Sequence, residues 1–225
     1  MIFQPIVLSF KVAAIATLFT FILGIFFARL LGKKDFPGRS ILEVLIILPM
    51  VLPPSVTGYG LLVFFGMNGF FGKFLNSIGI QVVFSWIGAV IAAVVVSFPL
   101  MYQSAKGAFG NIDRSYERAA RTLGAGEKKI FWTITLPLAW PGIVSGIVLS
   151  FSRAIGEFGA TIMVAGNIPG KTQTIPLAIY FAVDSGDSAT ANTLVAVITI
   201  FSFVLIFLLN LWLKKKNYNE MGRVS

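Results

Sequence analysis

The chain has 225 residues, a formal net charge of +9 at pH 7, 56% hydrophobic residues and only 12% charged residues, whereas a soluble domain carries about 25% charged residues. This composition indicates an α-helical integral membrane protein. Cysteine and histidine are both absent, which excludes disulfides, thiol chemistry, histidine-based acid–base catalysis and the commonest metal-ligand sets.

Long apolar segments predict the membrane-spanning helices of one transmembrane domain covering residues 1–225. Five segments are long enough to cross a bilayer, at about 3–31, 41–65, 84–102, 138–165 and 192–213. A further apolar segment, 175–183, is too short to cross and predicts a re-entrant or surface-lying helix. The fold class expected from the sequence is therefore an all-α, polytopic helical bundle embedded in a lipid membrane.

The basic residues are concentrated in three of the segments that lie between or after the spans. Residues 29–39 contain four Lys or Arg, residues 104–135 contain six, and residues 214–225 contain four. Such segments face the cytoplasm, so five alternating spans place the N-terminus outside and the C-terminus inside. Membrane orientation explains this positive charge better than nucleic-acid binding does, and no nucleic-acid partner is expected.

The longest polar segment, 106–135, is predicted to form two short helices joined by a turn. Asp113 is a suitable N-cap for the first helix, and Gly124 ends it. The second helix is expected from Glu127 to Thr135, with Pro137 ending its pattern. Small side chains between basic residues allow close approach of another protein, so we interpret the segment as a docking element. The alternative is an ordinary basic loop that only orients the protein in the membrane.

Prolines interrupt the predicted second span. Pro53 and Pro54 remove backbone donors and bend a helix, and breaks at membrane depth are typical of transport pathways. Ser55 and Thr57 follow directly, and their hydroxyl groups are candidate donors to a passing anion. The alternative is a proline kink that serves packing alone.

Ionisable residues also lie inside the predicted fourth span, where they are costly and therefore functional candidates. Arg153 and Glu157 are four residues apart and share a helix face. The residues around Glu157 are candidates for a flexible gate of the pathway: Gly156, Phe158 and Gly159. The alternative is a local ion pair that ties helices together.

No segment has the spacing of a nucleotide-binding loop, a nucleophile–base arrangement or a metal-ligand cluster. We therefore expect no enzymatic activity, no metal site and no cofactor bound by this chain. Energy for transport has to come from another subunit.

The polar segment resembles the cytoplasmic coupling loop of ABC-importer permeases. The matching residues are Ala119, Ala120, Gly124, Ile134, Leu136 and Pro137, and Ala125 is a further candidate for the contact to the ATPase. One position departs from the pattern: Arg118 replaces the usual glutamate, and Glu117 stands one residue earlier. Either side chain is therefore a candidate for the polar contact to the ATPase.

Further stretches between about residues 36 and 180 resemble the molybdate ABC transporter permease family. They are Phe36-Pro37-Gly38, Leu48-Pro49, Val51-Leu52-Pro53-Pro54, Phe98-Pro99-Leu100, Ala119 to Ala125, Thr133 to Leu138, Gly156 to Thr161 and Gly166 to Gly170. Sulfate permeases are similar but tend to carry tyrosine at the position of Phe158. Tungstate and sulfate or thiosulfate permeases therefore remain alternatives.

The resemblance implies a permease of the ABC-importer type in the cytoplasmic membrane of a prokaryote, moving molybdate with energy from ATP. It implies two copies of this chain, two ATPase subunits that hold ATP-Mg and dock through residues 117–137, and an extracytoplasmic oxyanion-binding protein. Three other classes are open alternatives: a passive anion channel, a membrane-embedded enzyme, and a scaffold that recruits an ATPase without transporting anything.

Overall fold

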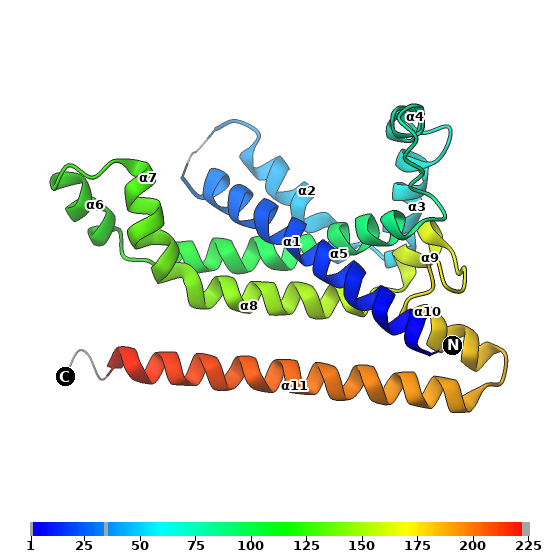
Figure 1. The fold of residues 1–225 in the computed structure, drawn as a ribbon. Helices are drawn as coiled ribbons and strands as arrows, with labels where there is room; N and C mark the ends of the chain where they lie inside the picture. The colour runs from blue at the N-terminus through cyan, green and yellow to red at the C-terminus, as the bar shows by residue number, and fades with distance from the viewer. Residues whose placement is uncertain (1, 34–35, 222–225) are drawn as a thin grey trace.

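The computed structural model describes residues 2–33 and 36–221, and this part of the chain is a bundle of helices (Figure 1). The helices are α1 (Phe3–Lys33), α2 (Arg39–Val51), α3 (Pro54–Phe65), α4 (Phe70–Ser77), α5 (Trp86–Gly110), α6 (Arg114–Thr122), α7 (Glu127–Ile130), α8 (Leu136–Ile155), α9 (Gly159–Ala165), α10 (Ile175–Asp184) and α11 (Ser188–Met221). A π-helical turn, Phe131–Thr135, joins α7 to α8. The all-α prediction is confirmed.

Small residues allow the three central helices, α1, α5 and α8, to pack closely against one another. A Cβ atom added to Gly24 of α1 would lie 2.6 Å from the Met101 side chain of α5. A Cβ atom added to Gly142 of α8 would lie 2.6 Å from Ala108 Cβ of α5, and one added to Gly146 would lie 2.7 Å from Ser104 Cβ of α5. Small residues at helix crossings are typical of membrane bundles, where van der Waals packing drives helix association.

Within the described residues, four helices are long and apolar enough to cross a membrane: α1, α5, the continuous helix Glu127–Ile155 and α11. The pair α2 and α3 makes a fifth span if it is counted as one. Segment α10 is a short apolar helix, as its sequence predicts. Helix α4, in the glycine-rich loop between α3 and α5, was not predicted.

The predicted second span, 41–65, is divided into two helices at the prolines that are expected to interrupt it. Helix α2 ends at Val51, α3 begins at Pro54, and their axes are bent by 118°. Pro53 is the N-cap of α3 with extended ψ, and Pro54 occupies its first position. Two successive prolines remove two backbone donors and force the preceding residue out of the helical region, so the chain turns sharply.

The fourth span is also broken, and it begins earlier than predicted. Helix α8 ends at Ile155, and α9 starts at Gly159. At the other end, Pro137 does not stop the helix, which runs without interruption from Glu127 to Ile155. The wider π-helical turn directly before Pro137 relieves the clash that a proline ring makes with the carbonyl four residues earlier.

Helix α11 lies to one side of the bundle (Figure 1), contacting mainly α10 and, to a smaller extent, α8. Few of its side chains are buried. The first turn of α1 and the last turn of α11 lie at opposite ends of the bundle (Figure 1). The end that carries α6 and α7 also carries the last turns of α1, α5 and α11, so the basic segments gather there.

Candidate functional site

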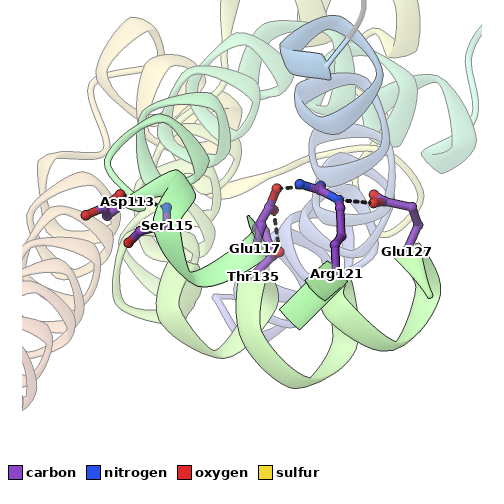
Figure 2. Close-up of polar contacts among 6 residues, drawn as sticks. All are labelled: Asp113, Ser115, Glu117, Arg121, Glu127 and Thr135. Atoms are coloured by element: carbon purple, nitrogen blue, oxygen red, sulfur yellow. Dashed lines mark hydrogen bonds and ion pairs between the residues drawn. The ribbon is translucent and has the colours of Figure 1, made fainter. Parts of the chain in front are cut away.

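The first candidate site is the protrusion formed by α6, α7 and the π-helical turn, which we call the coupling segment (residues 113–135). Helix α6 begins as predicted, because the Asp113 carboxylate accepts a 2.8 Å hydrogen bond from the backbone N–H of Ser115 (Figure 2). This bond holds the pKa of Asp113 below its usual value. Gly124 ends α6 at φ +79°. The backbone N–H of Gly124 donates to the carbonyl oxygen of Arg121, and the N–H of Ala125 donates to the carbonyl oxygen of Ala120. These two bonds form a Schellman motif.

A polar network ties the two helices of the coupling segment together (Figure 2). Arg121 contacts Glu127 at 2.6 Å and Glu117 at 3.1 Å. The hydrogen bond to Glu127 is the main reason why the pKa of Arg121 is raised. The Thr135 hydroxyl donates a 2.8 Å hydrogen bond to the second oxygen of Glu117. Helix α6 is therefore attached to the base of α8 as well as to α7.

The predicted docking residues fall into two groups. Arg118, Ala119 and Gly124 are exposed on the coupling segment, whereas Ala120 is buried. Among the remaining predicted residues, Glu117, Ala125, Ile134 and Leu136 are half-buried and Pro137 is exposed. Only part of the predicted small-residue patch is therefore available to a partner.

Sequence reasoning missed two apolar residues on the same protrusion. Leu123 is 87% exposed directly before Gly124, and Tyr116 is 57% exposed. Together the two side chains add apolar surface to the protrusion, which fits a contact with another protein. The available signal was a leucine placed next to the helix-ending glycine.

We expect that Arg121→Met loosens α6 from α7, because it removes the ion pair with Glu127 that joins them, together with the Glu117 pair that orients Arg121 on α6. Amide hydrogen exchange across residues 114–130 should become faster, while exchange in α5 and α8 stays unchanged. Lys128→Met is the matched control, because it removes a neighbouring exposed charge from α7. Equal exchange in the two variants would contradict a holding role for Arg121.

The second candidate site is the place where the two broken spans meet, which we call the junction (residues 53–58 and 153–163). A Cβ atom added to Gly159 would lie 2.7 Å from the Cβ atom of Pro54. One added to Gly58 would lie 2.8 Å from Ala160 Cα. The structure thus brings together two predicted groups that are about a hundred residues apart in the sequence.

Glu157 holds the break between α8 and α9. Its side chain is 2% exposed and contacts the Arg153 guanidinium at 2.7 Å. The other carboxylate oxygen accepts a 2.7 Å hydrogen bond from the Ala160 backbone N–H, in the first turn of α9. The predicted ion pair is present, and its acidic member also caps the helix that follows.

Hydroxyl groups near the junction are buried without protein partners. Thr57 Oγ1 and Ser152 Oγ are inaccessible to solvent and make no hydrogen bond within the described part of the chain. The Ser55 side chain, in contrast, is exposed. The ring centroid of Phe158 lies 5.2 Å from the ring centroid of Tyr180 in α10. Within residues 2–33 and 36–221, no acidic cluster could hold a metal ion. The junction thus brings together two helix breaks and several hydroxyl groups.

Broken apolar spans with a helical protrusion at one end define a polytopic membrane transport component. The chain belongs to the family described as binding-protein-dependent transport system inner membrane component, whose sequence profile matches residues 6–215. It is thus a multi-pass, inner-membrane permease subunit and not an enzyme.

Three relatives illustrate its position in the family. The chain is 46% identical over 221 residues to the molybdenum transport system permease protein ModB of Escherichia coli, covering 98% of this chain and 96% of that one. The chain is 44% identical to the molybdenum transport system permease protein ModB of Haemophilus influenzae, and the match covers 96% of this chain and 95% of that one. The chain is 36% identical to the sulfate transport system permease protein CysT of Salmonella typhimurium, and the match covers 91% of this chain and 76% of that one.

Two solved structures have the same fold. A bacterial ABC transporter that imports alginate contains a chain with a TM-score of 0.77 and 17% identity, covering 95% of this chain and 79% of that one. The MetNI methionine ABC transporter, in an inward-facing conformation, gives a TM-score of 0.68 and 16% identity, covering 96% and 95%. These likenesses extend to the fold alone.

Proposed function

We propose that the chain is the permease subunit of an ATP-driven importer that moves molybdate across the cytoplasmic membrane. The observation that carries the proposal is the similarity to molybdenum permeases over nearly the whole chain. The identity to a sulfate permease is lower. Tungstate and sulfate or thiosulfate remain alternative substrates, because all are tetrahedral dianions or close analogues.

The partners that follow are a second copy of this chain, two ATPase subunits that carry ATP-Mg, and an extracytoplasmic oxyanion-binding protein. Each ATPase docks on one coupling segment. The exposed residues Arg118, Ala119, Leu123 and Gly124 supply the contact surface. Glu117 is turned toward Arg121 and Thr135, so Arg118 supplies the polar contact.

The coupling segment is connected to the junction by one continuous helix. Movement of an ATPase shifts α6, and the contacts of Glu117 with Thr135 and of Arg121 with Glu127 carry the shift to Glu127–Ile155. This helix ends at the Arg153–Glu157 pair and the start of α9. Binding of ATP thus shifts the permease between two conformations through its different affinity for each.

The anion path runs past the junction. The candidate residues for the path and its gate are Pro53, Pro54, Ser55, Thr57, Arg153, Gly156, Glu157, Phe158 and Gly159. The exposed hydroxyl group of Ser55 at the junction supports this placement. A path of hydroxyl groups binds anions weakly, so selectivity belongs to the delivering protein.

The gathering of basic segments at the α6 end supports a cytoplasmic position for that end. The C-terminus then lies in the cytoplasm and the N-terminus outside.

The test is molybdenum accumulation in cells that lack this gene, grown in trace molybdate with excess sulfate. Wild-type chain should restore accumulation, whereas Gly124→Asp should restore less than a tenth, because position 124 needs a left-handed backbone (φ +79°) at the docking surface. Gly126→Asp is the matched control. It adds the same charge two residues away at φ −70°, an N-cap position that aspartate favours.

Equal rescue by Gly124→Asp and Gly126→Asp would overturn ATPase coupling and favour a passive anion channel. Uptake of tungsten or sulfur without uptake of molybdenum would still support an importer, but one with a different substrate. Molybdate-stimulated ATP hydrolysis by the reconstituted complex without uptake would favour a scaffold.

A further inference from the structure

Two hollows adjoin each other where the coupling segment meets α1. One is a cavity of about 700 Å³ among the last turns of α1 and α5, the start of α2, and α6. The other is a groove of about 720 Å³ between α1 and the helix that starts at Glu127. Arg29 and Phe131 line both. The Arg29 guanidinium lies over the Phe131 ring, 3.7 Å from its centroid.

The cavity is strongly basic. Its cations come from four helices: Arg29, Arg39, Lys106, Arg114, Arg118 and Arg121. Among residues 2–33 and 36–221, two carboxylates line it, Glu117 and Glu127, and Arg121 contacts both. Among the residues that the structure describes, Arg29, Arg114 and Arg118 form no ion pair. The cavity therefore carries a surplus of positive charge that suits an anionic group.

The groove, in contrast, is lined almost entirely by apolar side chains. They are Phe21, Ile22, Ile25, Phe26, Leu30, Phe131, Trp132, Leu136 and Trp140, and among the described residues the one charged side chain in the lining is Arg29. Ile22, Phe26 and Trp132 are each more than half exposed on its outer side. Tryptophan is enriched at the level of lipid headgroups, so the groove lies where an acyl chain meets its headgroup.

We infer that one anionic phospholipid occupies both hollows, with its phosphate in the basic cavity beside Arg29 and an acyl chain along the groove. A free oxyanion would satisfy the cavity and leave the groove open, whereas a phospholipid matches the charge of one and the apolar surface of the other. The lipid joins α1 to the base of the coupling segment. This role goes beyond transport of the substrate and does not depend on its identity.

The test is native mass spectrometry of the protein, purified with its copurifying subunits, after addition of phosphatidylglycerol or phosphatidylcholine. Phosphatidylglycerol should bind at least tenfold more tightly. Arg29→Gln and Arg114→Gln should each weaken it about five- to tenfold. Lys214→Gln is the control, because it removes a charge from the C-terminal part of α11, and Lys214 does not line the cavity.

The groove is tested separately. Ile22→Asn should also weaken the binding of phosphatidylglycerol. Ile200→Asn, at a similarly exposed position on α11, should leave this binding unchanged. The inference fails if the two lipids bind alike or if Lys214→Gln weakens binding as much as Arg29→Gln. It also fails if inorganic phosphate binds to the wild type and is lost with Arg29→Gln while lipid binding is unchanged, since the site would then hold free oxyanions.

Discussion

Replacing Arg153 with methionine should lower the free energy of unfolding by about 3 kcal/mol, the cost typical of removing one partner from a buried ion pair. Glu157 is 2% exposed and would keep only the Ala160 N–H as a partner. Arg153→Met should therefore show a lower midpoint of thermal unfolding in detergent. Glu157→Gln should cost less, because the amide oxygen can still accept the bond from Ala160 and Arg153 is one-third exposed.

The double variant, Arg153→Met with Glu157→Gln, separates the two roles open to this pair. If the pair only ties α8 to α9, the double variant should be more stable than Arg153→Met and should regain transport. If Arg153 also contacts the passing anion, stability should recover while transport remains low. Wild-type stability in Arg153→Met alone would contradict both accounts.

Gly58→Ala should destabilise the junction by about 2 kcal/mol, within the range for overpacked cores. The added Cβ would lie 2.8 Å from Ala160 Cα, a backbone atom that cannot move without shifting α9 against α3. Transport should fall as well, because the two helix breaks would be forced apart.

Gly60→Ala is the matched control, one half-turn further along α3. No heavy atom lies within 4 Å of a Cβ atom placed there. Alanine stabilises a helix by up to about 1 kcal/mol relative to glycine, so this variant should be neutral or slightly more stable. The close crossing of α3 and α9 would be refuted if both variants had the same unfolding midpoint in detergent.

Much of the fold follows from local sequence signals. Long apolar runs predict α1, α5 and α11, and the shorter run at 175–183 predicts α10. Asp113 and Gly124 predict where α6 begins and ends, because capping depends on one or two side chains. These features need no knowledge of distant contacts.

The remaining features depend on tertiary structure. Pro53 and Pro54 indicate a bend, but its angle of 118° is set by the packing of α3 against α9. Pro137 normally ends a helix, and no sequence rule used here anticipates the π-helical turn that lets the helix continue past it. The contact of Gly58 with Ala160 joins segments far apart in the sequence.

The substitution at position 118 illustrates the same limit within the site. From the sequence, Glu117 and Arg118 are equally suited to contact the ATPase. The structure separates them, because Glu117 bonds to Thr135 and Arg121 within its own chain while Arg118 is exposed. The direction of a side chain on a nine-residue helix depends on what the helix packs against.

The continuous helix Glu127–Ile155 has a mechanical consequence. At 1.5 Å per residue, its 29 residues extend about 44 Å, whereas the hydrocarbon core of a bilayer is about 30 Å thick. One end therefore stands outside the lipid while the other reaches into it. A rod of this length acts as a lever: tilting it by about 10° moves one end by roughly 8 Å relative to the other.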